Sequence, residues 1–350
     1  MSDLQLSLLA IGALVVAAVC LYNWMQERRF RRRLRRAFGD APDDVLLRSG
    51  IESVLADGRL EPQLDPATAA GGRDRPPAPG FDAMLDYVAG IDSSAPIAEP
   101  AVDELMSKIA DCGKPVQVRG YDAESGEWEE VLRGAGGGYS GLRIALQLVN
   151  RSGPVNAAQL SSFCDAVRSC ADRAAASAAC PDTRAALATA RELDAFCSNV
   201  DVAFGFNIIA REGDTFAGVR IRALAESAGF KLESDGVFHF PDEHRRTAFT
   251  LDNHEPAPFL PERIKTLSTH GITVLLDVPR VADGPKVLDR MHEIARGLAT
   301  TLGGRLVDDN RAVLNETSIA RIREQLRSIH AAMEARGIPA GGVRALRLFS

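Results

Sequence analysis

Three histidines in the C-terminal half are the first residues whose types and spacing could do chemistry. His239, His244 and His254 surround a charged segment that contains Asp242 and Glu243. Imidazole and carboxylate groups brought together in this way could bind a metal ion such as zinc. An exposed polar turn between two strands explains the same residues more simply. We therefore expect no metal site.

Other chemical motifs in the chain are incomplete. The glycine-rich segment at 134–141 lacks the Lys-Ser/Thr pair of a P-loop and the spacing of a dinucleotide-binding turn. Asp308 and Asp309 are adjacent, and adjacent strand residues point to opposite faces, so we expect no catalytic dyad. The sequence thus predicts neither an enzyme nor a bound cofactor. An unrecognised hydrolase stays open as an alternative and would require converging polar groups.

The cysteines show no spacing typical of a metal or redox site. Of the six cysteines, Cys20 lies in an apolar run and the others are scattered after residue 100. None forms a C-x-x-C pair or lies at a metal-ligand spacing from a histidine. Cys164 and Cys170 continue a helical apolar stripe with Leu160 and Val167. We expect these two to be small buried hydrophobic residues.

The charge distribution argues against nucleic-acid binding. The formal net charge is −6, but residues 1–40 hold seven of the 41 basic and three of the 47 acidic residues. The first 40 residues therefore carry +4 and the remainder −10. An acidic body is a poor match for a phosphate backbone. With 46% hydrophobic and 25% charged residues, the chain is globular in composition rather than disordered.

A long uncharged segment near the N-terminus predicts a membrane anchor. Leu4 to Met25 comprises 22 residues without a charge, and a helix of that length spans ~33 Å, enough to cross a hydrocarbon core. Tyr22 and Trp24 suit the membrane interface. A cleaved signal peptide and a buried core helix are the alternatives. A signal peptide carries its positive charge before the apolar run, where this chain has only Asp3.

The arginines behind this segment predict its orientation. The positive-inside rule places the N-terminus outside the cytoplasm and everything after Arg36 in the cytoplasm, as expected of a single-pass membrane protein. Each arginine near an anionic leaflet adds ~1 kcal/mol of attraction. The membrane-flanking residues are Arg28, Arg29, Arg31, Arg32, Arg33, Arg35 and Arg36.

The elements that must position any site follow a linker rich in Pro, Gly and Ala. The predicted organisation is a transmembrane anchor (1–26), a basic flank and flexible linker (27–80), a first α+β module (81–200), a second α+β module (201–337) and a tail (338–350). The hydrophobic patterns run twice through a similar order of strands and helices. The predicted fold class is α+β, with two split-βαβ modules, each an antiparallel sheet with helices on one face.

The second module has the clearer pattern. Residues 201–209 alternate, with Phe204, Phe206 and Ile208 on one face, and residues 271–279 form another predicted strand. Helices are predicted around 218–230 and along a last apolar stripe from Ile319 to Met333, which is either core or an oligomerisation seam. Because helices cover one side of each sheet, the other side is left free. We expect function on that open face.

Five stretches of this module occur in the order and at close to the spacing of a known family. They are NIIAREGDTFAG, ALAESAGF, FTLDN, HGITVLLDVPRV and LGGRLVDDNRAVLNETSIARIREQL. From residue 201 onward the chain resembles the bacterial cell-division protein family ZipA, and the N-terminal anchor with its basic flank is also similar. The resemblance implies that 201–337 is a ZipA-like FtsZ-binding module. It also implies that the membrane is the cell inner membrane, with the N-terminus in the periplasm and the C-terminal domains in the cytoplasm.

The resemblance implies a non-enzymatic role in septum formation during the cell cycle. The family tethers the division ring of FtsZ to the cytoplasmic membrane, and its C-terminal domain binds the FtsZ C-terminal tail in a shallow apolar groove on the open sheet face. The groove positions correspond to Ala203, Gly205, His254, Thr273 and Leu275, together with a position near Asp235 or Gly236. The strand parity places four of them on the face opposite the core.

Several of these positions differ in size from their family counterparts. Branched aliphatic residues, methionines and a phenylalanine are replaced by smaller or polar residues, and each large apolar side chain lost removes ~1.5–3 kcal/mol of burial. We expect the tail to be held by Leu275 and Val237 with polar help from His254. The alternative function is a membrane-anchored regulatory domain pair that binds a small metabolite between its modules.

Overall fold

The computed structural model describes residues 78, 80–132, 134 and 138–350. Cys197–Phe349 form one compact unit, called here the C-terminal unit, and the described residues up to Phe196 form the N-terminal unit. The predicted anchor and nearly all of the predicted linker lie outside the described residues. Within the described ranges, no helix is long and apolar enough to cross a membrane.

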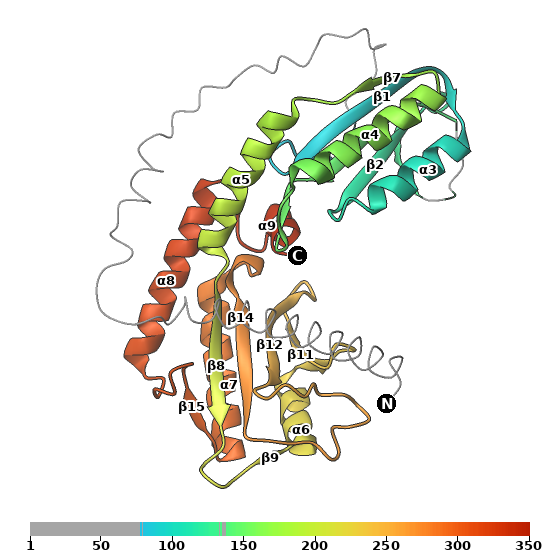
Figure 1. The fold of residues 1–350 in the computed structure, drawn as a ribbon. Helices are drawn as coiled ribbons and strands as arrows, with labels where there is room; N and C mark the ends of the chain where they lie inside the picture. Colours follow the sequence, from blue (N-terminus) through green and yellow to red (C-terminus); the bar gives the residue numbers. More distant parts are fainter. Residues whose placement is uncertain (1–77, 79, 133, 135–137) are drawn as a thin grey trace, which may run out of the picture. The chain divides into compact units, whose positions relative to one another are not determined.

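The N-terminal unit is built on a five-stranded antiparallel sheet (Figure 1). The strand order is β3-β2-β4-β1-β7. The strands are β1 (Asp86–Ile97), β2 (Val116–Asp122), β3 (Trp128–Glu130), β4 (Tyr139–Gln147) and β7 (Ser177–Ala179), and a separate short hairpin joins β5 (Val149–Asn150) to β6 (Gly153–Pro154). Strand β1 begins at Asp86, after a turn in which the Asp82 carbonyl accepts hydrogen bonds from the backbone N–H groups of Leu85 and Asp86.

Two helices cover one side of this sheet, and a third leads to the next unit along the chain. Helices α3 (Glu99–Ala110) and α4 (Ala157–Arg173) pack against each other, and α5 (Thr183–Val200) follows β7. Asn156 begins α4 with a capping box, in which its side chain and that of Gln159 satisfy each other's backbone N–H groups. Strand β4 is buried along its length except at Arg143, and its Leu142, Ile144 and Leu146 are fully buried.

The C-terminal unit is built on a six-stranded antiparallel sheet with the order β10-β11-β12-β14-β8-β15. Its strands are β8 (Ala203–Ile209), β10 (Lys231–Leu232), β11 (Phe238–Pro241), β12 (Thr247–Asn253), β14 (Gly271–Asp277) and β15 (Arg305–Val307). A two-stranded pair of β9 (Phe216–Ala217) and β13 (Ser268–Thr269) lies outside this sheet. The pattern predicted the hairpin β11–β12 but not the short strands β9, β10 and β13.

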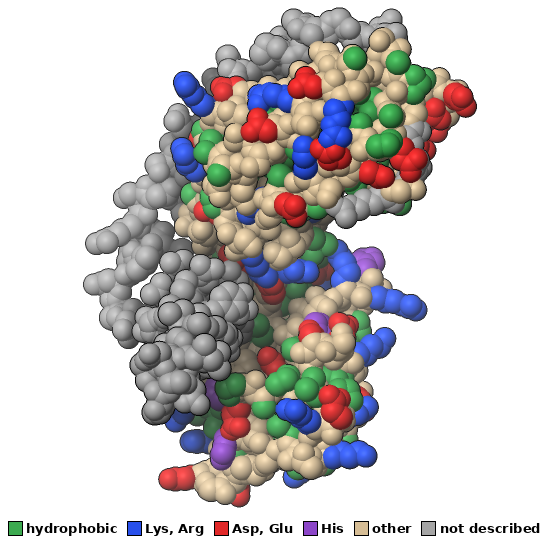
Figure 2. All heavy atoms as spheres, turned by 45° about the vertical axis from the view of Figure 1, so that its right-hand side comes forward, with side chains coloured by type: hydrophobic (Ala, Val, Ile, Leu, Met, Phe, Trp, Pro, Cys, Tyr) green, Lys and Arg blue, Asp and Glu red, His purple; other side chains and the backbone are tan. Residues whose placement is uncertain are grey.

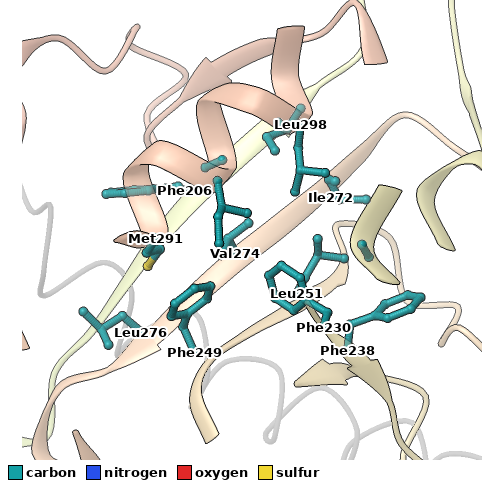
Figure 3. Packing of buried hydrophobic residues seen from close by; sticks show 14 of the residues in the cluster. Phe206, Phe230, Phe238, Phe249, Leu251, Ile272, Val274, Leu276, Met291 and Leu298 are labelled. Carbon is teal, nitrogen blue, oxygen red and sulfur yellow. The ribbon is translucent and has the colours of Figure 1, made fainter. Parts of the chain in front are cut away.

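Helices cover one face of this sheet and close the core. They are α6 (Gly218–Ala228), α7 (Gly284–Leu302) and α8 (Glu316–Ala335), with a short 3-10 turn η2 (Val278–Arg280) after β14. Phe206 and Val274 point from neighbouring strands toward Met291 and Leu298 of α7 (Figure 3). Leu251 and Phe249 of β12 extend the same core, in which apolar burial supplies most of the stability.

The apolar stripe of α8 packs into the core rather than forming an exposed oligomerisation seam. Ile319, Ile322, Leu326 and Met333 of α8 are buried, so the core alternative is confirmed. After α8 the chain turns back, and α9 (Val343–Leu348) packs against η2. Residues 338–350, predicted only as a tail, therefore contribute buried side chains to this unit.

The two units share their central pairings. In the N-terminal unit, β1 precedes α3 and pairs with β4, which comes before α4. In the C-terminal unit, β8 precedes α6 and pairs with β14, which comes before α7. The strand after the second helix then pairs with the first strand, as β7 with β1 and β15 with β8. The fold is α+β with antiparallel sheets, and each sheet carries its helices on one side.

Candidate functional site

The candidate site lies on the face of the C-terminal sheet that is turned away from α6, α7 and α8, called here the outer face. The alternate residues of β8 and β14, such as Phe204 and Leu276, are fully buried in the helix-covered core. Because successive side chains of a strand point to opposite sides, their neighbours in sequence point to the outer face. The predicted parity of both strands is therefore correct.

The register brings the predicted residues of β8 and β14 together. Leu275 pairs with Gly205, and Asp277 pairs with Ala203. On the other side of Leu275, the partner in β12 is Thr250. Ala203 and Leu275 are both half-buried. The glycine opposite Leu275 leaves its side chain without a bulky cross-strand neighbour on that side, so a short apolar patch lies at this end of the face.

Val237 and His254 reach the outer face from loops next to the strands. Val237 directly precedes β11 in a turn where Gly236 adopts a φ of +79°. His254 follows β12 and is exposed, and its Nδ1 lies 3.2 Å from the Thr273 hydroxyl oxygen. The structure thus places all six predicted binding residues on or beside one face. Their role in binding stays a prediction.

Two residues that the sequence analysis did not select complete a hydrogen-bonded chain across this face. The Thr273 hydroxyl donates to Asn207 Oδ1 at 2.7 Å, and the Asn207 amide donates to Asp309 Oδ1 at 2.8 Å. With His254 the chain crosses from the end of β12 over β14 and β8 to the residues after β15. Asn207 shares the parity of Gly205, which was the available signal. Asp309 had none.

Burial makes ionisation of two carboxyl groups on this face unfavourable. Burial raises the pKa of Asp309 above its usual value, although the Asn207 amide partly opposes the shift. The second oxygen of Asp309, Oδ2, is buried without a hydrogen-bond partner. Burial also raises the pKa of Asp252, which pairs with Thr273 across β12 and β14. The middle of the outer face is therefore polar, where the family resemblance implies an apolar groove.

The other chemically suggestive residues lie apart from one another. His239 contacts the Thr247 hydroxyl oxygen at 3.1 Å and the Asp235 carboxylate at 3.0 Å, while His254 contacts Thr273. Across the residues that the structure describes, no group of three or more His, Cys, Asp or Glu side chains is arranged to hold a metal ion.

The adjacent aspartates after β15 act separately. Asp308 Oδ1 accepts hydrogen bonds from the backbone N–H groups of Asn310 and Ala312 and so closes a turn. Asp309 instead faces Asn207. The two carboxylates therefore have different hydrogen-bond partners.

The visible surface shows mixed charge. In the space-filling view of Figure 2, acidic and basic side chains are interspersed on both units rather than gathered into one basic patch. A phosphate-binding surface would require clustered lysine and arginine.

Comparison with known proteins matches the C-terminal unit to one family. Residues 203–325 match the profile described as ZipA, C-terminal FtsZ-binding domain. "Cell division protein ZipA" of Marinobacter nauticus is 29% identical over 125 residues, which cover 35% of this chain and 37% of that protein. The protein of the same name from Shewanella loihica is 27% identical over 128 residues, covering 34% and 38%. The chain thus spans less than two-fifths of the length of these curated relatives.

Proposed function

We propose that this chain is a non-enzymatic adaptor of cell division that binds FtsZ. The premise is that residues 203–325 place the chain in the ZipA family. The observation that carries the proposal is the match of this segment to an FtsZ-binding domain. The segment contains β8, β14 and the outer face, so the matched region includes the whole candidate site.

The FtsZ C-terminal tail is the proposed ligand, and the outer face is its proposed site. Leu275 and Val237 would supply apolar contact, and His254 a polar contact at the edge. Ala203 and Gly205 have small side chains, which allow a peptide backbone to approach the sheet closely. A segment bound there would gain the burial of Leu275 and of its own apolar side chains.

The polar chain through the middle of the face sets a requirement on the ligand. A purely apolar side chain placed over the half-buried Thr273 and the exposed His254 would displace water without replacing its hydrogen bonds. A tail residue that can donate a hydrogen bond there would avoid that cost. We propose that the apolar patch supplies affinity and that the polar chain fixes the register of the bound segment.

Membrane tethering is the second part of the proposal. It rests on the uncharged run from Leu4 to Met25 and on the seven arginines behind it. Fractionation of cells that express the full chain, compared with a chain that begins at residue 81, checks this part separately. Full-length protein in the membrane fraction and shortened protein in the soluble fraction are expected. Equal distribution of both would contradict an anchor.

Binding of a fluorescent FtsZ C-terminal tail peptide to the full chain tests the adaptor role. We expect micromolar affinity, and we expect Leu275→Glu to abolish it because the carboxylate would be buried against the peptide. Val219→Glu is the matched control, since Val219 is a 50% exposed valine on α6, on the opposite side of the sheet.

The outcomes separate the function from the site. Binding that survives Leu275→Glu would keep the function and reject the outer face. Loss of binding in both variants would point to unfolding, which circular dichroism detects. If the parent protein shows no binding at a concentration of about 1 mM, the binding free energy is weaker than about 4 kcal/mol. That result would reject the FtsZ tail as the ligand.

A further inference from the structure

One phenol and two thiols meet in the N-terminal unit, outside the matched domain. Tyr87 of β1 is buried, and its hydroxyl donates to the Pro181 carbonyl at 2.8 Å. The same oxygen lies 3.4 Å from Cys164 Sγ in the middle of α4. Cys180 directly precedes Pro181, so Tyr87 holds the segment that carries Cys180 against the helix that carries Cys164.

The contacts of Tyr87 bring the two thiols close together. The neighbouring Cys180 thiol is the main cause that lowers the pKa of Cys164 below its usual value. Tyr87 and Arg168 lower it further, whereas burial and Asp165 oppose the shift. Burial instead raises the pKa of Cys170 to about 11. The lowered pKa of Cys164 favours its thiolate, which is the reactive form of cysteine.

Access to the pair is provided by its second member. Cys164 is only 1% exposed, but Cys180 is partly exposed between β7 and α5. Both sulfurs are free thiols, and each lies in a different element, on α4 or after β7. A partly exposed thiol next to a second thiol is the arrangement found at redox-responsive cysteines.

We propose that Cys164 and Cys180 form a reversible dithiol–disulfide pair that is oxidised by hydrogen peroxide. The thiolate of the pair attacks one oxygen of the peroxide and becomes a sulfenic acid, while the O–O bond breaks and the other oxygen leaves as hydroxide, which takes the proton of the second thiol to become water. The resulting second thiolate then attacks the sulfenic sulfur, the S–O bond breaks, and the hydroxide that leaves takes a proton from the solvent as the disulfide forms. A dithiol reductant restores both thiols.

The disulfide would fix a weakly held part of the N-terminal unit. Strand β7 is a three-residue edge strand that pairs only with β1, and it leads through Cys180 into α5. Closing a bond from Cys180 to α4 would tie this edge to the helix layer. The proposal does not depend on FtsZ binding, because no residue of the outer face takes part.

Peptide mapping of the full chain tests the proposal directly. The reduced protein is treated with hydrogen peroxide, its remaining thiols are blocked with N-ethylmaleimide, and it is digested with trypsin. Cleavage after arginine separates the three cysteines, because Cys164 falls in peptide 152–168, Cys170 in 169–173 and Cys180 in 174–184. We expect peptides 152–168 and 174–184 joined, and separated again by dithiothreitol.

Two variants provide matched controls. Cys170→Ser removes a buried thiol on the same helix and should leave the joined peptide unchanged. Cys180→Ser and Cys164→Ser should each abolish it. Recovery of Cys164 and Cys180 in the blocked form, at a peroxide concentration that oxidises free glutathione, would overturn the proposal. Equal yields of cross-links to other cysteines would also overturn it.

Discussion

The hydroxyl of Thr273 donates a hydrogen bond to the side-chain oxygen of Asn207 across 2.7 Å, from β14 to β8, on the outer face. A threonine hydroxyl has one proton, so the contact between Thr273 and His254 requires the imidazole Nδ1 to donate. The chain therefore has one direction, from His254 through Thr273 to Asn207. Asn207 then donates to Asp309 through its amide nitrogen.

Thr273→Val should break this chain with little change in shape. The buried Asn207 oxygen would lose its donor, and an unsatisfied buried acceptor costs about 1–3 kcal/mol. We expect the free energy of unfolding in urea to fall by that amount. Thr250→Val is the matched control, because Thr250 lies on the same face of the adjacent strand and pairs with Leu275. An equal loss in both variants would mean that the chain contributes nothing specific.

Asp309→Asn should stabilise the protein at neutral pH. The pKa of Asp309 is raised in the fold, so the stability linked to its proton is present below the ordinary pKa of 3.8 and is lost as the pH rises through the raised value. Asparagine cannot ionise and still offers an oxygen to the Asn207 amide. Urea unfolding at pH 7 should show the variant to be the more stable, and the difference should shrink on acidification.

The control for this pH dependence is Asp214→Asn, at an exposed site in the loop between β8 and β9. Its unfolding free energy should follow that of the parent across the same pH range. If Asp309→Asn were less stable than the parent at pH 7, the carboxylate charge would be favourable in the fold, and the cause assigned to the pKa shift would be wrong.

Phe349→Ala should destabilise the C-terminal unit strongly, although Phe349 lies beyond the matched residues 203–325. Its side chain is fully buried, and its carbonyl accepts a hydrogen bond from Arg280 at 3.0 Å. Truncating a buried phenylalanine to alanine costs about 3–5 kcal/mol. Thermal or urea unfolding measures the loss. Val343→Ala, at a 78% exposed site on α9, should change stability by less than about 0.5 kcal/mol.

Gly297→Ala should stabilise the same unit, because Gly297 is an exposed residue within α7 and an added Cβ would meet nothing within 4 Å. Replacing a helical glycine by alanine gains about 0.5–1 kcal/mol. Gly218→Ala should act in the opposite direction. Its Cβ would lie 2.5 Å from the Ile264 carbonyl oxygen, and such overpacking costs about 1–3 kcal/mol. Similar unfolding midpoints for the two variants would contradict both expectations.

Strand parity was the part of the candidate site that the sequence could predict. In β8 and β14 every second residue is a large apolar side chain, so the two-residue period assigns Gly205 and Leu275 to the outer face without any tertiary information. The hairpin β11–β12 and the core stripe of α8 were also predictable from local patterns. The hairpin has a charged turn between two strands, and the stripe follows the 3.6-residue period of a helix.

The polar chain and the thiol pair could be recognised only in three dimensions. Asn207 and Asp309 are 102 residues apart, and the contact depends on β15 lying beside β8. Cys164 and Cys180 show no motif spacing, because a helix, a turn and the edge strand β7 separate them along the chain. Tyr87 brings them together from a third element. Such contacts carry no periodic signal in a single sequence.

The sequence by itself determined which side of each regular strand or helix is apolar, because that pattern follows from the geometry of one element. It also determined the family resemblance and the uncharged N-terminal run. The tertiary structure decided which strands are neighbours, and therefore which polar side chains meet on the outer face and which thiols meet beside Tyr87. Strand order depends on packing between distant segments, and that packing is a property of the whole core rather than of any local pattern.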